Sequence, residues 1–97
     1  MPTYISLVRW TEKGIGDVKK SPERLDKAKQ AFKAAGGELK QFYLVMGRYD
    51  MVVISEGKDD ESASRAALTL GAGGAIRTET LRAFTEDEYR KIIGSLP

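Results

Sequence analysis

Histidine and cysteine are both absent from this chain of 97 residues. Without cysteine the chain has no disulfide framework, no thiolate metal ligand and no cysteine nucleophile. Without histidine it has no imidazole general base, no serine–histidine pair and no haem-ligating histidine. Any chemistry that the chain performs would therefore depend on carboxylates, phenols or the reactivity of the ligand itself.

Long apolar runs and a strong net charge are also missing. No run approaches the roughly 18 residues of a membrane span, and the first residues lack the basic and apolar regions of a signal peptide. Sixteen basic and fourteen acidic side chains leave a formal charge of +2, which is too small to indicate a nucleic-acid partner. We therefore expect a cytoplasmic protein with neither a membrane nor a nucleic-acid partner.

The composition is that of a folded domain, because 41% of the residues are hydrophobic and 31% are charged. The length suits a single domain over residues 1–97. A domain of this size buries only about two-thirds of the surface that its unfolded chain exposes. Oligomerisation would therefore add useful core.

Hydrophobic periodicity and turn residues divide the chain into four strands and three helices. The predicted order is strand 3–10, loop 11–20, helix 21–35, strand 38–46, strand 51–56, helix 59–71, strand 75–84 and a short terminal helix after Thr85. This β-α-β-β-α-β order is typical of the ferredoxin-like α+β fold, in which an antiparallel sheet carries two helices on one face.

Residues at the helix ends support this assignment. Ser21 is a good N-cap, and Pro22 suits the first helical position. Asp59 opens the second long helix, where an acid complements the helix dipole. Thr85 caps the terminal helix, whose apolar side chains we expect to face inward, namely Tyr89, Ile92 and Ile93.

The first two strands carry apolar groups on both faces. Strand 3–10 has Tyr4, Val8 and Trp10 opposite Ile5 and Leu7, and strand 38–46 has Leu39, Tyr43 and Val45 opposite Phe42, Leu44 and Met46. Two helices cover only one face, and a second face in water would alternate cleanly between apolar and polar residues. We therefore expect a second copy of the sheet to cover it in a homodimer. The alternative is a face shielded by the terminal helix.

The stretch from residue 44 to residue 54 is the most informative part of the chain. Two strongly β-forming runs flank Gly47, Arg48, Tyr49 and Asp50. Gly47 supplies a positive φ at no steric cost, and an Asp side chain readily accepts hydrogen bonds from nearby amides. The stretch predicts a tight hairpin in which Gly47 is structural and Asp50 bonds amides of the turn. A second interpretation has Asp50 facing a cavity, as a base or in contact with an amine.

Four stretches of the chain form a recognisable set. They are Trp10-Thr11 followed by Gly14-Ile15, then Ser21-Pro22-Glu23-Arg24, the turn Gly47-Arg48-Tyr49-Asp50, and the run from Arg77 to Phe84. Together they resemble the GYD domain family over almost the whole chain. The resemblance implies the dimeric α+β barrel version of the ferredoxin-like fold. Because the family is largely uncharacterised, and the fold hosts cofactor-free monooxygenases, isomerases, haem enzymes and amino-acid-sensing modules, the resemblance implies no particular activity.

Several aromatic and polar side chains are candidates for binding a small ligand. Arg82 could hold a carboxylate in two parallel hydrogen bonds, or it could pair with Glu79 or another acid. Tyr49 could donate a hydrogen bond to a ligand or pack over the turn. Ligand pockets combine apolar walls with a few polar groups. The candidate set has that composition and consists of Trp10, Tyr43, Tyr49, Asp50, Thr78, Thr80 and Arg82.

No metal or cofactor motif is recognisable. The acidic clusters at residues 59–61 and 86–88 lie at predicted helix starts, where the helix dipole accounts for them. Gly14-Ile15-Gly16 follows a strand, but Lys19 stands where a dinucleotide fingerprint needs its last glycine. We therefore expect neither a metal nor a cofactor.

These observations favour a small homodimer that binds a small anionic organic molecule in a sensing or storage role. One alternative is a cofactor-independent monooxygenase or isomerase that would use Asp50, Tyr43 or Tyr49, with Arg82 as an electrostatic anchor. The other alternative is a structural interaction module. The sequence assigns no catalytic residue.

Overall fold

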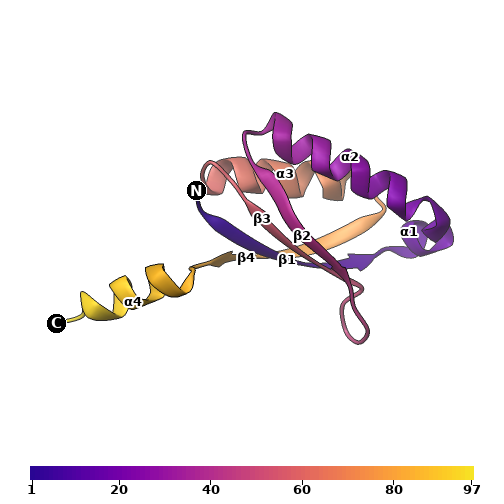
Figure 1. The fold of residues 1–97 in the computed structure, drawn as a ribbon. Helices are drawn as coiled ribbons and strands as arrows, with labels where there is room; N and C mark the ends of the chain where they lie inside the picture. Colours follow the sequence, from indigo (N-terminus) through magenta and orange to yellow (C-terminus); the bar gives the residue numbers. More distant parts are fainter.

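The computed structural model describes the whole chain, from Met1 to Pro97, and contains one four-stranded antiparallel sheet. The elements along the chain are β1 (Thr3–Trp10), α1 (Glu12–Gly16), the 3-10 helix η1 (Val18–Lys20), α2 (Ser21–Ala34), β2 (Glu38–Leu44), β3 (Met51–Glu56), α3 (Asp60–Ala72), β4 (Ile76–Ala83) and α4 (Glu86–Gly94). The strands lie in the order β2-β3-β1-β4. Helices α2 and α3 cover one face of the sheet (Figure 1). The predicted ferredoxin-like α+β fold is confirmed.

The core lies between the sheet and these two helices. Antiparallel pairing of β1 with β3 places Val8 opposite Met51, and both side chains form a buried cluster with Val53. Four partly buried side chains from β1, β2 and β4 pack against this cluster, namely Trp10, Leu39, Phe42 and Ile76. The cluster therefore joins all four strands on the helix-facing side, where removal of apolar surface from water stabilises the fold.

A β-bulge changes the faces of β2 from those predicted. The register with β3 shifts between Leu39 and Gln41. Leu39 and Phe42 consequently both reach the core, although strict alternation assigned them to opposite faces. The prediction was wrong here because a bulge inserts one extra residue and inverts the alternation beyond it. Strand β2 also ends at Leu44 rather than at Met46.

The predicted loop 11–20 contains two short helices, α1 and η1. Thr11 caps α1, because its side-chain oxygen accepts a hydrogen bond from the amide of Gly14 at 3.1 Å. Helix η1 runs directly into α2, so Lys20 occupies the N-cap position of α2 and makes no side-chain capping bond. The prediction of Ser21 as the cap was therefore wrong, since Ser21 is already the first residue of α2.

The connection between β2 and β3 is a protruding loop over residues 45–50 rather than a tight turn. Its two ends are joined by a hydrogen bond from the amide of Val45 to the carbonyl oxygen of Asp50, at 2.9 Å. Gly47 has φ of +120°, which confirms the predicted positive φ. A side chain at this position would be strained, because L residues with a Cβ rarely adopt positive φ.

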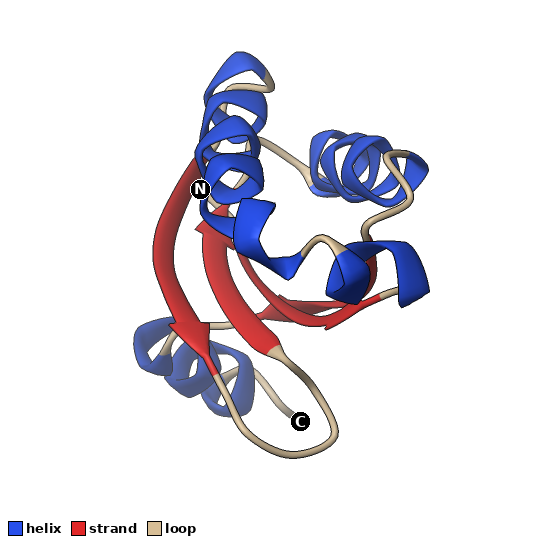
Figure 2. Cartoon of the chain, turned by 90° about the vertical axis from the view of Figure 1, so that its right-hand side faces the viewer, coloured by secondary structure: helices blue, strands red, loops and turns tan.

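Helix α4 does not fold back onto the sheet. Its N-terminus is a capping box of Thr85 and Glu88, which confirms the predicted cap. The prediction that its apolar side chains face inward was wrong, because Tyr89, Ile92 and Ile93 are all exposed. Both views show α4 extending away from the body, on the side of the sheet opposite to α2 and α3 (Figures 1 and 2).

The face of the sheet opposite to α2 and α3 has no helix lying across it, and we call it the open face. Strand pairing places Ile5 beside Ile54 and Leu81, and Leu7 beside Val52. Tyr43 on β2 continues this apolar row beyond Val52. Each of the four strands therefore places at least one apolar side chain on the open face, and two polar side chains, Gln41 on β2 and Glu79 on β4, flank them at opposite edges. None of the helices combines the length and the apolar character that crossing a bilayer requires.

Candidate functional site

A cavity of about 260 Å³ lies between the helix-facing side of the sheet and helices α2 and α3. Its walls are mainly apolar and include Trp10, Leu25, Phe32 and Phe42. Four serine and threonine side chains of the sheet also line it, and they are Ser6, Ser55, Thr78 and Thr80. An apolar wall with a few convergent polar groups is the usual composition of a small-molecule site.

Serine and threonine side chains form the polar part of this cavity. The hydroxyls of Ser6 on β1 and Thr80 on β4 are hydrogen-bonded to each other at 3.1 Å. Ser55 on β3 is only 2% exposed. Short hydroxyl-bearing residues at core positions leave volume that larger apolar side chains would fill. Ser6 and Ser55 were missed among the candidate residues, although their positions in otherwise buried strand faces were a usable signal.

Tyr4 lines the cavity and joins β1 to the start of α3. Its hydroxyl donates a hydrogen bond to Oδ1 of Asp60 at 2.5 Å. Burial of the ring raises the pKa of Tyr4 to about 12, and the hydrogen bond to the Asp60 carboxylate contributes in the same direction. The phenol is therefore protonated at neutral pH and acts as a hydrogen-bond donor rather than as a base.

Arg82 lies beside Tyr4, at the edge of a second groove between α3 and β4 that Thr78 and Thr80 also line. Its Nε is 3.8 Å from Oδ1 of Asp60, so its acidic partner is Asp60 rather than Glu79. The guanidinium lies 4.4 Å from the centroid of the Phe84 ring and donates a hydrogen bond to the carbonyl of Ala83. Aromatic contact and ion pairing thus hold this cation in place.

Tyr49 and Tyr43 lie on the other side of the sheet from the cavity. The Tyr49 hydroxyl donates a hydrogen bond to Oε2 of Glu79 at 2.5 Å, and the Arg9 guanidinium lies 4.8 Å from its ring centroid. The bond to the Glu79 carboxylate raises the pKa of Tyr49 above its ordinary value. Glu79 pairs with Leu7 in the register, so Tyr49 folds over the open face, where Tyr43 is 51% exposed.

Asp50 anchors the end of the hairpin to β1. Its Oδ2 accepts a hydrogen bond from the amide of Trp10 at 2.9 Å, and its own amide donates to the carbonyl of Val8. The carboxylate therefore bonds a backbone amide, as predicted, but the amide belongs to the neighbouring strand and not to the turn. Proximity in the chain suggested the turn, whereas strand pairing decided the partner.

The candidate ligand residues consequently fall into two groups. Trp10, Thr78 and Thr80 meet at the cavity, while Tyr43 and Tyr49 belong to the open face. Asp50 and Arg82 hold structural contacts at the edges of these two regions. No group of three or more acidic side chains converges where it could hold a metal ion.

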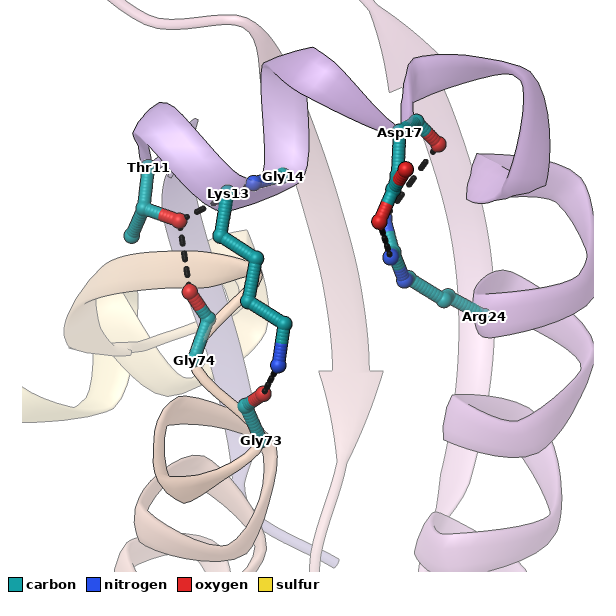
Figure 3. Close-up of polar contacts among 7 residues, drawn as sticks. All are labelled: Thr11, Lys13, Gly14, Asp17, Arg24, Gly73 and Gly74. Carbon is teal, nitrogen blue, oxygen red and sulfur yellow. Dashed lines mark hydrogen bonds and ion pairs between the residues drawn. The ribbon is translucent and has the colours of Figure 1, made fainter.

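Helix α1 is attached to the rim of the cavity, close to the C-terminal end of α3. The Thr11 hydroxyl donates to the carbonyl of Gly74 at 2.5 Å, and Nζ of Lys13 donates to the carbonyl of Gly73 at 3.3 Å (Figure 3). Farther along, Arg24 of α2 pairs with Asp17 at 3.5 Å (Figure 3). The bonds of Thr11 and Lys13 fix the connection between β1 and α2 against the connection between α3 and β4, and the Arg24–Asp17 pair ties the same connection to α2.

Comparison with known proteins agrees with this architecture. A protein of Thermus thermophilus, named "Glutamine synthetase and cystathionine beta-lyase binding protein", is 36% identical over 84 residues, which are 86% of this chain and 88% of that protein. A solved structure of a Thermus thermophilus protein has a TM-score of 0.57 at 25% identity, over 88% of this chain and 95% of that one.

Two more distant solved structures share the fold alone. A protein of Pyrococcus horikoshii has a TM-score of 0.59 at 24% identity, over 89% of this chain and 93% of that one. The leucine response regulatory protein of Mycobacterium tuberculosis has a TM-score of 0.54 at 15% identity, over 89% of this chain and 54% of that one. The GYD domain sequence model matches residues 4–93, and the chain therefore belongs to the GYD domain family.

Proposed function

We propose that this protein is a binding protein that acts as a homodimer and docks onto other proteins. The observation that carries the proposal is the open face, which has an apolar centre with side chains from all four strands and has no helix of the same chain on it. Monomeric proteins rarely expose a continuous apolar patch of this kind. The relative named for binding glutamine synthetase and cystathionine beta-lyase supports a protein-binding role. The proposal includes the cytoplasmic location expected from the sequence.

The open faces of two copies supply the proposed dimer interface. Sheets pack face to face at about 10 Å, and a stable interface buries about 1,200–2,000 Å² in total. The apolar centre of such an interface would be a cluster of five side chains from β1, β3 and β4, namely Ile5, Leu7, Val52, Ile54 and Leu81. The charged side chains of Arg9 and Glu79 would lie toward its rim.

The dimer is tested by placing a charge in the centre of the open face. Leu81→Glu should dissociate the dimer, because an unpaired carboxylate would be buried between two apolar sheets. The matched control is Leu68→Glu on α3, where Leu68 is 72% exposed and lies on the helix layer. Sedimentation velocity at micromolar concentration should give a dimer for the parent and for Leu68→Glu. A parent protein that sediments as a monomer would refute the dimer.

Protein binding is tested with purified enzymes rather than with a lysate. Glutamine synthetase and cystathionine beta-lyase from the same source are titrated separately by isothermal calorimetry, with an unrelated enzyme as the control. We expect saturable binding to at least one of the two enzymes. Absence of a heat of binding with both enzymes, at concentrations about 100 times a micromolar dissociation constant, would remove this part of the proposal.

A second candidate function is binding of a small anionic organic molecule in the cavity. It is favoured by the apolar walls and the hydroxyl groups of Ser6, Thr78 and Thr80. Arg24 and Lys27 are the cationic side chains among the cavity lining, and they would complement a carboxylate. Trp10 would supply an aromatic wall. The small size of the cavity suits a single ring with a short acidic substituent.

A thermal-shift screen with small aromatic carboxylates tests the second candidate. A ligand at about 100 times its dissociation constant should stabilise the fold by about 2.7 kcal/mol. Ala67→Leu on α3 fills part of the cavity and should abolish the shift, whereas Ala72→Leu at the exposed end of the same helix should preserve it. A shift that survives Ala67→Leu would place the ligand elsewhere.

A further inference from the structure

The open face has a protruding element at each end. Helix α4 extends from one end, and the β2–β3 hairpin loop over residues 45–50 extends from the other (Figure 1). Figure 2 shows that both lie on the side of the sheet away from α2 and α3. The two elements therefore bracket the surface through which the proposed dimer forms.

Both elements carry large apolar side chains without cover in the same chain. On the hairpin loop the side chain of Met46 is 100% exposed. On α4 the apolar stripe of Tyr89, Ile92 and Ile93 is about half exposed, at 56%, 43% and 50% respectively. Side chains of this size gain free energy when they are removed from water.

Local bonds do not account for the stability of α4. Its capping box and the ion pair between Arg90 and Glu86, at 2.9 Å, act within the helix. A helix of 9 residues is shorter than the ~12–15 residues at which isolated helices are even marginally stable in water. Burial of the apolar stripe against another surface is therefore the remaining source of stability.

Geometry and charge select the surface that would cover this stripe. A helix is about 10–12 Å wide, which matches the ~10 Å between packed sheets, whereas two stacked α4 helices would need twice that space. The first turn of α4 carries Glu86, Asp87 and Glu88, and the hairpin presents the exposed cation of Arg48. Pairing of α4 with the hairpin therefore fits better than pairing of α4 with α4.

We propose that α4 of one copy packs its apolar stripe against the hairpin of a second copy, with Ile92 close to Met46. The two-fold symmetry of a dimer makes this contact twice, because each copy offers one α4 and one hairpin. The inference rests on the proposed homodimer and specifies which ends of the two open faces meet.

Because the chain contains no cysteine, any disulfide in a variant must form between introduced cysteines. Three variants are oxidised under identical conditions, namely Met46→Cys, Ile92→Cys and the double variant with both changes. The double variant should form a covalent dimer on a non-reducing gel, whereas neither single variant should form one, because each disulfide needs both positions within about 7 Å between Cα atoms. The matched control combines Leu68→Cys on α3 with Ile92→Cys and should remain uncrosslinked.

The outcomes separate this inference from the proposed function. A covalent dimer from Ile92→Cys alone would show that α4 meets α4 and would overturn the inference while leaving the homodimer. A double variant that sediments as a dimer but does not crosslink would also overturn the inference alone. A parent protein that sediments as a monomer would overturn both.

A deletion variant gives an independent readout. Removal of residues 85–97 should weaken dimerisation by about tenfold or more, as measured by sedimentation equilibrium, because the apolar stripe of α4 is lost from the interface. Circular dichroism should show that the sheet is retained, because no strand lies beyond residue 83. An unchanged dimer affinity would overturn the contact between α4 and the hairpin.

Discussion

Two short helices, α1 and α4, begin in the same way and end in different surroundings. Each is capped by a threonine whose side-chain oxygen accepts a backbone amide, Thr11 in one case and Thr85 in the other. The Thr11 hydroxyl also donates to the carbonyl of Gly74, far away in the chain. The bonds of Thr85 remain within α4. A cap therefore determines where a helix begins, while long-range contacts determine where it lies.

The largest expected effect comes from the closest contact of α1. A Cβ at Gly14 would overlap the carbonyl oxygen of Ala75, whereas a Cβ at Gly16 would meet nothing. Gly14→Ala should lower the free energy of unfolding by about 3 kcal/mol, because the backbone must move to accommodate it. Gly16→Ala is the control and should change stability by less than about 1 kcal/mol. Urea denaturation measures both, and equal effects would show that α1 is not held by this contact.

The next largest effect is expected from loss of the two hydrogen bonds of the Thr11 hydroxyl. Thr11→Ala removes the cap of α1 and the bond to Gly74 together, so it should destabilise the fold by about 2 kcal/mol. Thr11→Ser retains the hydroxyl and should recover most of that loss. If Thr11→Ser were as damaging as Thr11→Ala, the methyl group rather than the two hydrogen bonds would anchor α1.

The bond between Tyr4 and Asp60 attaches the start of α3, whose far end holds α1. Tyr4→Phe should lower stability at neutral pH by about 1 kcal/mol through loss of this bond. The folded-state pKa of about 12 exceeds the ordinary tyrosine value of 10.0, so the folded protein binds more protons than the unfolded chain between these values. The stabilisation is therefore complete below pH 10 and is lost as the pH rises toward 12.

Denaturation at a series of alkaline pH values tests this titration. The parent should lose stability more steeply than Tyr4→Phe between pH 10 and pH 12, the window set by the two pKa values of Tyr4. Parallel curves for the two proteins would show that Tyr4 does not carry the alkaline loss of stability.

The smallest global effect is expected at the cap of α4. Thr85→Ala should accelerate amide hydrogen exchange in α4, because the helix loses its capping box. The free energy of unfolding of the sheet should change by less than about 0.5 kcal/mol at protein concentrations that keep the chain monomeric. A global loss as large as that of Thr11→Ala would show that α4 contacts the body of the same chain.

Sequence patterns predicted most of the fold because they reflect interactions between near neighbours. Strands β1 and β3 have the predicted bounds, and each end of α2 and α3 lies within one residue of its predicted position. The exceptions are the segments whose structure depends on distant partners. Helix α1 was predicted as loop, since its cap and its tight glycine contact become recognisable only beside Gly74 and Ala75.

The candidate site was less predictable than the fold. Alternation along β1 and β4 brings Trp10, Thr78 and Thr80 to one cavity. The hairpin carries Tyr49 around to Glu79 on the other side of the sheet. The bulge in β2 inverts the alternation of side chains, so Tyr43 lies on the face of the sheet opposite to that of Leu39. One inserted residue thus separates side chains that a regular pattern would place together.

The sequence by itself determined the number and order of the main strands and helices, the positive φ at Gly47 and the threonine cap of α4. Each depends on residues within one or two turns of the chain, where propensity and hydrogen bonding act directly. The tertiary structure decided that Asp50 bonds the amide of Trp10, that α1 docks on the end of α3, and that α4 stands away from the sheet. These features depend on which groups distant in the sequence come into contact. A local pattern of apolar and polar residues shows that a surface must be covered, but it does not show which other surface covers it.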